Sequence, residues 1–233
     1  MYGLMVILSI SVANILLKVV CRKKELDIAI ACTMEIYGGI GAILGAKILY
    51  CFECYLINQV ILEVISCKNG YSFYGGVILG IVFIKIGCLI HRFCFEIYVR
   101  ELCFIVPIMH SIWKLGCYFA GCCYGIETAS AIGQKFTEGS IAPTNVSLVP
   151  IQLIECMCLL ILSMFLWFLN RRNKLKFPIS MYLVGYAIPR FFVEFFRENE
   201  KYMGLSVAQW ISLMCVLIVG IKYVINDKRR FRR

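Results

Sequence analysis

The sequence predicts an all-α integral membrane protein with about seven transmembrane helices, forming one polytopic domain over residues 1–233. Composition is the first observation: 61% of the residues are hydrophobic and only 16% are charged, whereas soluble domains carry about 25% charged residues. The second is that the apolar residues come in long runs, and about 20 such residues are enough for a helix to cross the hydrocarbon core. The third is that basic residues gather at the ends of these runs.

Seven apolar runs mark the predicted spans. They are Tyr2–Val20, Ile28–Leu56, Phe73–Ile90, Leu102–Tyr118, Val149–Leu169, Ile179–Phe196 and Ser206–Ile225. No basic segment precedes the first run and no small-residue cleavage site follows it, so we expect a retained span and not a signal peptide. The polar loop Gly125–Leu148 is too short to form a domain of its own.

The net charge of +10 could indicate a nucleic-acid partner, but the position of the charges favours a topology signal. Four segments are basic: Cys21–Lys24, the link that holds Arg92 and Arg100, Arg171–Lys176 and Lys228–Arg233. With seven spans all four lie on one side, and the opposite loops hold chiefly Lys68, Lys135, Arg197 and Lys201. The positive-inside rule then predicts an outer N-terminus, a cytoplasmic C-terminus and no nucleic-acid partner.

The 14 cysteines do not form the pattern of a disulfide framework. Most stand singly inside apolar segments, where cysteine behaves as a small hydrophobic residue: Cys32, Cys88, Cys158 and Cys215. Cys51 and Cys54 have CxxC spacing, but without a second pair of ligands we do not expect a zinc site there.

Ionisable residues inside the predicted spans are the candidates for function, because they are costly in the membrane and usually face a partner or a cavity. They are Glu35, Lys47, Lys85, His110, Lys114, Glu155, Arg190 and Glu194. Lys47 and Lys85 can instead reach the membrane surface with their long side chains. A lone His110 can equally be a hydrogen-bonded residue between helices.

Arg190 and Glu194 stand four residues apart, so they lie on one helix face and can form an ion pair. Arg197 follows one turn later. A guanidinium group can hold a phosphate through two oxygens, which fits a lipid headgroup at the outer end of a span. The alternative is a structural ion pair that joins helices.

Two glycine-rich elements accompany these charges. Lys114 precedes a segment of glycines and small residues that ends at Gly125, and Tyr74 precedes Gly75 and Gly76. Glycines can expose backbone N–H groups to an anion, or they can let two helices pack closely.

These elements, in this order, resemble the prolipoprotein diacylglyceryl transferase family over almost the whole chain. The resembling motifs are Tyr2–Met5, Gly45–Tyr50, Phe73–Gly76, Lys114–Gly125, Pro150–Glu155, Arg190–Arg197 and Leu205–Trp210. The glycine-rich segment and the Arg-Glu-Arg block are the specific ones. The chain departs from the family where Tyr74 replaces a usual His, where Lys47 and Lys114 replace Arg, and where Cys117 replaces a frequent Asn.

The resemblance implies transfer of a diacylglyceryl group from phosphatidylglycerol to the lipobox cysteine thiol of a prolipoprotein, with no metal or cofactor. Lys114 and Arg190 would hold the lipid phosphate, and Glu194 would orient Arg190. Tyr2 and His110 would handle protons or contact the headgroup. The resemblance assigns substrate binding to Tyr74, Gly75, Gly76, Cys117, Gly121, Gly125, Gln152, Glu155 and Arg197.

The implied partners are phosphatidylglycerol, other membrane lipid and prolipoprotein signal peptides, and the implied location is the bacterial cell membrane. Two alternatives stay open at this point. One is a divergent relative that acts on another lipid or acceptor, which the replacements at Tyr74 and Lys114 favour. The other is a non-catalytic lipid-binding membrane protein or small transporter.

Overall fold

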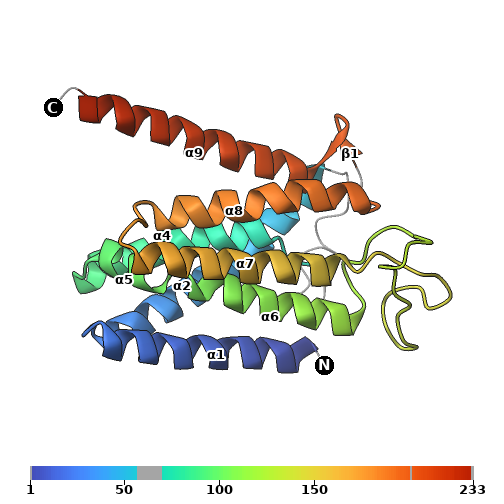
Figure 1. Cartoon of the computed structure of the whole chain (residues 1–233), viewed down its shortest axis with the longest axis horizontal. Coiled ribbons are helices and arrows are strands. Elements are labelled where there is room, and N and C mark those ends of the chain that lie inside the picture. Colours follow the sequence, from blue (N-terminus) through green and yellow to red (C-terminus); the bar gives the residue numbers. More distant parts are fainter. Residues whose placement is uncertain (1, 57–69, 200, 232–233) are drawn as a thin grey trace. The chain divides into compact units, whose positions relative to one another are not determined.

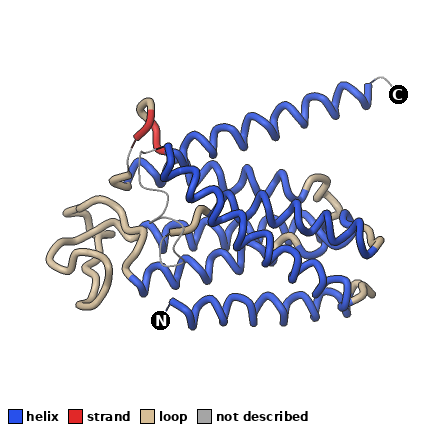
Figure 2. The backbone as a smooth tube through the Cα atoms, turned by 180° about the vertical axis from the view of Figure 1, so that it is seen from behind, coloured by secondary structure: helices blue, strands red, loops and turns tan. Residues whose placement is uncertain are grey.

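The structure, a computed structural model, describes residues 2–56, 70–199 and 201–231. Lys68 and the last two arginines of the C-terminal basic segment lie outside these ranges. The described residues are mainly helical (Figure 1), with few strand residues (Figure 2). They form two compact units, one of residues 1–16 and 99–233 and the other of residues 17–98. The expectation of a single membrane domain stays a prediction.

The unit of residues 17–98 is built around two packed helices. Its elements are the second part of α1 (Tyr2–Lys23), α2 (Ile28–Leu56), α4 (Phe73–His91) and the start of α5 (Phe95–Leu102). Gly45 of α2 lies against Gly75 of α4, and a Cβ atom added to Gly45 would meet the Gly75 carbonyl oxygen and, at 2.6 Å, Leu79 Cβ. The two backbones therefore touch because neither glycine has a side chain.

The unit of residues 1–16 and 99–233 holds the remaining elements. They are α6 (Ile105–Ala120), α7 (Ile151–Arg171), α8 (Pro178–Val193), the 3-10 turn η1 (Glu194–Phe196), strands β1 (Lys201–Tyr202) and β2 (Leu205–Ser206), and α9 (Val207–Phe231). Consecutive helices pack on one another from α6 to α9. The loop between α6 and α7 leaves this unit at the same end as the β1–β2 hairpin (Figures 1 and 2).

Helix α7 shows how apolar side chains are divided between the protein interior and the exposed surface. Glu155, Leu159, Leu162 and Leu166 follow helical spacing and are buried. Large apolar side chains on its other faces are exposed: Met157, Ile161, Met164, Phe165 and Phe168. A helix that is apolar on all faces is typical of a membrane span, and here the buried face is the one that carries the polar groups.

The predicted fourth span, Leu102–Tyr118, agrees with α6 within a few residues, but the sequence did not predict the short helix α5 that precedes it. The chain forms α5 and then α6, and the two helices are bent by 51° at a short break. Pro107 lies in the first turn of α6. Proline has no N–H to donate to the carbonyl four residues earlier, that of Cys103, and its ring clashes with that carbonyl, which favours a break at this point.

Within the described residues, six helices are long and apolar enough to cross a membrane, and the bent pair α5–α6 raises the number to seven. The chain is therefore a mostly helical protein with six or seven candidate membrane spans, as the sequence predicts. Pro178 lies in the first turn of α8, where the fixed φ angle and the missing N–H of proline suit a helix.

The glycine contact between α2 and α4 can be tested with Gly45→Ala. The added methyl group has no room against the Gly75 backbone, and overpacking of this kind costs about 1–3 kcal/mol, so we expect a lower melting temperature. Gly39→Ala is the matched control, because it lies in the same helix with nothing within 4 Å of an added Cβ. Equal melting temperatures of the two variants would contradict the close helix contact.

Candidate functional site

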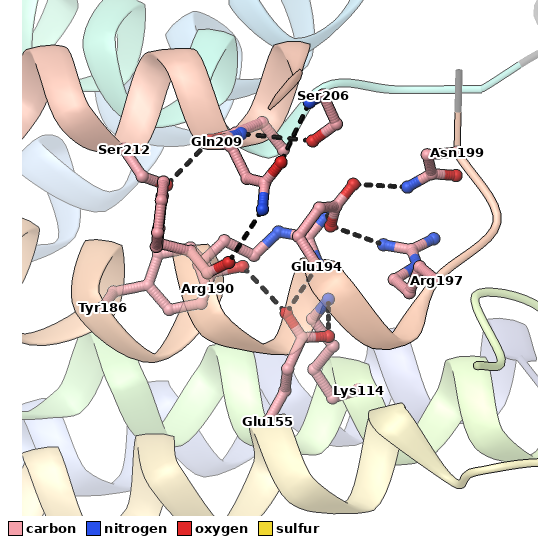
Figure 3. Close-up of polar contacts among 12 residues, drawn as sticks. Lys114, Glu155, Tyr186, Arg190, Glu194, Arg197, Asn199, Ser206, Gln209 and Ser212 are labelled. Atoms are coloured by element: carbon pink, nitrogen blue, oxygen red, sulfur yellow. Dashed lines mark hydrogen bonds and ion pairs between the residues drawn. The ribbon is translucent and has the colours of Figure 1, made fainter. Parts of the chain in front are cut away.

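A buried carboxylate, Glu155 of α7, joins three helices. Its Oε2 atom lies 2.6 Å from Lys114 Nζ of α6, and its Oε1 atom lies 3.2 Å from Arg190 Nη1 of α8. The hydroxyl group of Tyr186, also on α8, donates a hydrogen bond of 3.3 Å to Oε1 (Figure 3). The Glu155 side chain is only 1% exposed, so both of its oxygens are compensated inside the protein.

A second buried carboxylate, Glu194, continues this network toward the end of the helix. Arg190 Nη2 lies 2.8 Å from Glu194 Oε2, and Arg197 Nη1 lies 3.7 Å from the same oxygen. The Asn199 amide donates to Glu194 Oε1 (Figure 3). The ion pair that the sequence predicts between Arg190 and Glu194 is present, and Arg190 also binds Glu155 through its other terminal nitrogen.

The charges of this cluster do not cancel. Lys114, Arg190 and Arg197 carry three positive charges and the two glutamates carry two negative charges, so in their ordinary ionised forms the net charge is +1. The cationic side chains are 11–14% exposed, whereas the carboxylates are 1–2% exposed. The accessible part of the cluster is therefore cationic, which suits an anionic ligand.

The glycine-rich segment forms a sharp turn at the end of α6. Gly121 adopts a left-handed conformation with a φ angle of 68° and ends the helix. The N–H of Cys122 then donates to the carbonyl of Cys117 at 3.0 Å, and that of Gly121 donates to Tyr118 at 3.0 Å. These two bonds form a Schellman motif, which satisfies the last carbonyls of the helix.

Gln152 and Gly125 hold this turn against the rest of the site. The buried Gln152 side chain donates to the carbonyl of Cys122 at 2.5 Å. Gly125 lies against the end of η1, where a Cβ atom would come within 2.7 Å of the Phe196 carbonyl oxygen. Both residues, which the resemblance assigns to the substrate, here contact the backbone that carries the cysteines and the Arg190–Arg197 block.

The thiol of Cys123 lies in this turn, outside the spans. Hydrogen bonds from the thiols of Cys117 and Cys122 lower its pKa, and the positive charges of Lys114 and Arg197 act in the same direction against the effect of burial. The side chain is therefore biased toward the thiolate.

His110 is a buried neighbour of the cluster. Its ring packs edge-on against Tyr186, with 4.8 Å between the ring centroids. Since Tyr186 donates to Glu155, His110 reaches the carboxylate through one aromatic side chain. Its assignment to proton handling or headgroup contact stays a prediction.

Ser206 and Gln209 cap the start of α9. The N–H of Ser206 donates to Gln209 Oε1 at 2.9 Å, and the N–H of Gln209 donates to Ser206 Oγ at 3.2 Å (Figure 3). This is a capping box at the start of α9. Gln209 Nε2 also donates to the carbonyl of Phe191 at 3.3 Å, next to Arg190. The spacing Ser-x-x-Gln is the sequence signal for this cap.

Some predicted site residues belong to the other unit, residues 17–98. Tyr74 is buried in α4, and Gly75 and Gly76 lie against the backbone of α2, the latter 3.1 Å from the Ala42 carbonyl oxygen when a Cβ is added. The contacts of these glycines are those of a helix-packing face. Lys47 Nζ lies over the Tyr50 and Tyr71 rings, 5.5 and 5.2 Å from their centroids. The side chain of Tyr2 is outside the described residues.

Sequence comparison places the chain among known proteins. The family model described as prolipoprotein diacylglyceryl transferase matches residues 1–225. The phosphatidylglycerol–prolipoprotein diacylglyceryl transferase of Clostridium tetani (strain Massachusetts / E88) is 33% identical over 241 residues, covering 100% of this chain and 94% of the relative.

Two further relatives carry the same name. Enzyme 2 of Clostridium perfringens (strain 13 / Type A) is 36% identical over 203 residues, covering 83% of this chain and 77% of the relative. The enzyme of Idiomarina loihiensis is 28% identical over 218 residues, covering 83% of this chain and 75% of the relative. With the match along residues 1–225 and these identities, the chain belongs to the prolipoprotein diacylglyceryl transferase family.

Proposed function

We propose that this protein transfers the diacylglyceryl group of phosphatidylglycerol to a cysteine thiol of a prolipoprotein, the cysteine of the lipobox. Family membership and the names of the relatives support the activity. They favour it over a non-catalytic lipid-binding role and over another acceptor. The observation that carries the proposal within the chain is the pair of cations, Lys114 and Arg190, held on the one buried carboxylate of Glu155.

The reaction joins sulfur to carbon and releases a phosphate ester. The thiolate sulfur attacks the glyceryl carbon that carries the phosphate, so that a C–S bond forms and the C–O bond breaks. The electron pair of that C–O bond leaves on the phosphate oxygen as glycerol phosphate, and the thiol proton passes to a base. Negative charge thus grows on the phosphate group as the bond breaks.

Lys114 and Arg190 meet this demand for positive charge. They are fixed before the lipid arrives, because Glu155 holds both of them and Glu194 holds Arg190 a second time. Cations that are already oriented stabilise a developing anion without further reorganisation. Glu194 and Arg197 orient Arg190 in this scheme, and Gln152, Gly121 and Gly125 keep the turn next to Lys114 in place.

We further propose that Tyr74 binds substrate and that Tyr2 and His110 handle protons or contact the headgroup. Tyr74 stands where the family usually has His, and its hydroxyl group can donate or accept one hydrogen bond. His110 packs against Tyr186, which donates a hydrogen bond to Glu155, so it lies close to the cluster that would bind the phosphate.

For the membrane, we propose the bacterial cell membrane with the N-terminus outside and the C-terminus in the cytoplasm. The positive-inside rule supports this orientation. The basic turn between α7 and α8 and the end of α9 lie at one end of their unit, and the long α6–α7 loop lies at the other (Figure 1). The cationic cluster lies toward the end with that loop, which would face outward, where lipoprotein precursors emerge.

Arg190→Lys tests the phosphate contact. Lysine keeps the charge but loses the planar fork that binds two carboxylates and a phosphate together, so we expect turnover of phosphatidylglycerol per folded molecule to fall on the order of 10²-fold. Arg172→Lys, an exposed arginine at the end of α7, is the control and should keep normal turnover. Melting temperatures measured alongside separate misfolding from lost chemistry. Normal turnover by folded Arg190→Lys would contradict the phosphate contact.

The orientation is tested by fusing a reporter after residue 233. A fluorescent protein that folds only in the cytoplasm should be bright, and an alkaline phosphatase that folds only outside should be inactive, because the last basic segment holds that end inside. Fusions after the β1–β2 hairpin give the opposite check, because there the fluorescent protein should be dark and the phosphatase active. Phosphatase activity at the C-terminal fusion would overturn the orientation.

A further inference from the structure

Three cysteine thiols meet at the turn that ends α6. Cys117 lies in the last turn of the helix, and Cys122 and Cys123 follow its left-handed cap residue Gly121. The three Sγ atoms all lie within 4.8 Å of one another. Cys117 is buried, whereas Cys122 and Cys123 are half-buried.

The backbone brings the thiols together in two steps. The Schellman bond from the N–H of Cys122 to the carbonyl of Cys117 folds the chain back over the helix end. Cys123 then adopts a left-handed conformation with a φ angle of 61°, which costs roughly 1–2 kcal/mol for a residue with a side chain. That strained conformation directs the third thiol to the other two, and the bond from Gln152 to Cys122 holds the turn in place.

This arrangement has the chemistry of a metal site. Zn²⁺ binds thiolates with Zn–S distances of about 2.3 Å, which places sulfurs about 3.8 Å apart in a tetrahedron. Three half-buried or buried thiols within 4.8 Å need only a small contraction to reach that spacing. Thiolate ligands select soft cations over Mg²⁺ or Ca²⁺, and no carboxylate or imidazole joins the group among the described residues.

We propose that Cys117, Cys122 and Cys123 bind one Zn²⁺ ion, with the fourth position left to water or another ligand from outside this group. Three thiolates and one Zn²⁺ ion carry a net charge of −1, and the positive charges of Lys114 and Arg197 lie close enough to act on Cys123. The site stands beside the cationic cluster and is separate from it. It departs from the expectation, drawn from the family resemblance, that no metal is involved.

A disulfide is the competing use of these thiols. A disulfide would join two of the cysteines, and the closeness of the third thiol to both would then have no explanation. Cys122 and Cys123 are neighbours in sequence, so a bond between them would close a small, strained ring. The mutual closeness of all three sulfurs therefore favours the metal.

Metal content of the purified full-length protein tests the proposal without depending on transfer activity. Purified in detergent without reductant or chelator, the wild type should carry about one zinc per chain. Cys122→Ser and Cys123→Ser should each lose most of it. Cys158→Ser and Cys215→Ser are the controls, because these half-buried cysteines of α7 and α9 lie outside the group of three thiols, and they should keep it.

Cobalt exchange and thiol labelling give a second readout on the same samples. Co²⁺ in the wild type and the controls should show thiolate-to-metal charge-transfer absorption, and Cys123→Ser should not. A chelator should make Cys122 and Cys123 react with iodoacetamide. Equal zinc in Cys123→Ser and the wild type, or a disulfide between two of the three cysteines in metal-free protein, would overturn the proposal. If Cys122→Ser or Cys123→Ser loses zinc but keeps normal transfer activity, the proposed function is unaffected and the ion has a structural role.

Discussion

The structure of the site depends on one buried carboxylate. Glu155 lies in an apolar helix and is almost completely enclosed, where an isolated charge would be very costly. Lys114 and Arg190 compensate it, so the three helices α6, α7 and α8 must lie where those contacts form. The same contacts fix the two cations, because neither can leave without exposing a buried charge to an apolar environment.

The second carboxylate, Glu194, fixes the orientation of the Arg190 side chain. It pairs with Arg190 at the C-terminal end of α8, and Arg197 and Asn199 bind Glu194 in turn. The carboxylates are the buried members and the cations are the partly accessible ones. The accessible side of the cluster is therefore cationic, and the ion pairs of Arg190 are compatible with the phosphate contact proposed for it.

Much of the fold could be predicted from the sequence because it depends on local patterns. The apolar runs gave the helices within a few residues, and the spacing of Arg190 and Glu194 gave their ion pair, since residues four apart share a helix face. The short helix α5 in the link before α6 was not predicted, although Pro107 signals a break between the two helices. A proline in the first turn is compatible with a helix start, and the apolar run alone did not show that a second helix ended there.

The contacts of Glu155 could not be predicted in this way. Lys114 is 41 residues before it and Arg190 is 35 residues after it, so the contacts depend on how the helices pack. The meeting of Cys117, Cys122 and Cys123 depends instead on two left-handed residues, Gly121 and Cys123. Glycine predicts the first of these conformations, but nothing in the sequence predicts the second.

The central claim is that Glu155 holds both cations, and Glu155→Gln tests it most directly. Loss of this charge leaves Lys114 and Arg190 without their shared partner, so we expect a loss of about 3 kcal/mol in stability, roughly 6–12 °C in melting temperature. Glu194→Gln should cost less, because Arg190 keeps the charge of Glu155 as its partner and the contact between Lys114 and Glu155 is unchanged. The transfer activity of folded Glu155→Gln should also fall below that of folded Glu194→Gln. A Glu155→Gln protein with the melting temperature and turnover of the wild type would contradict the account.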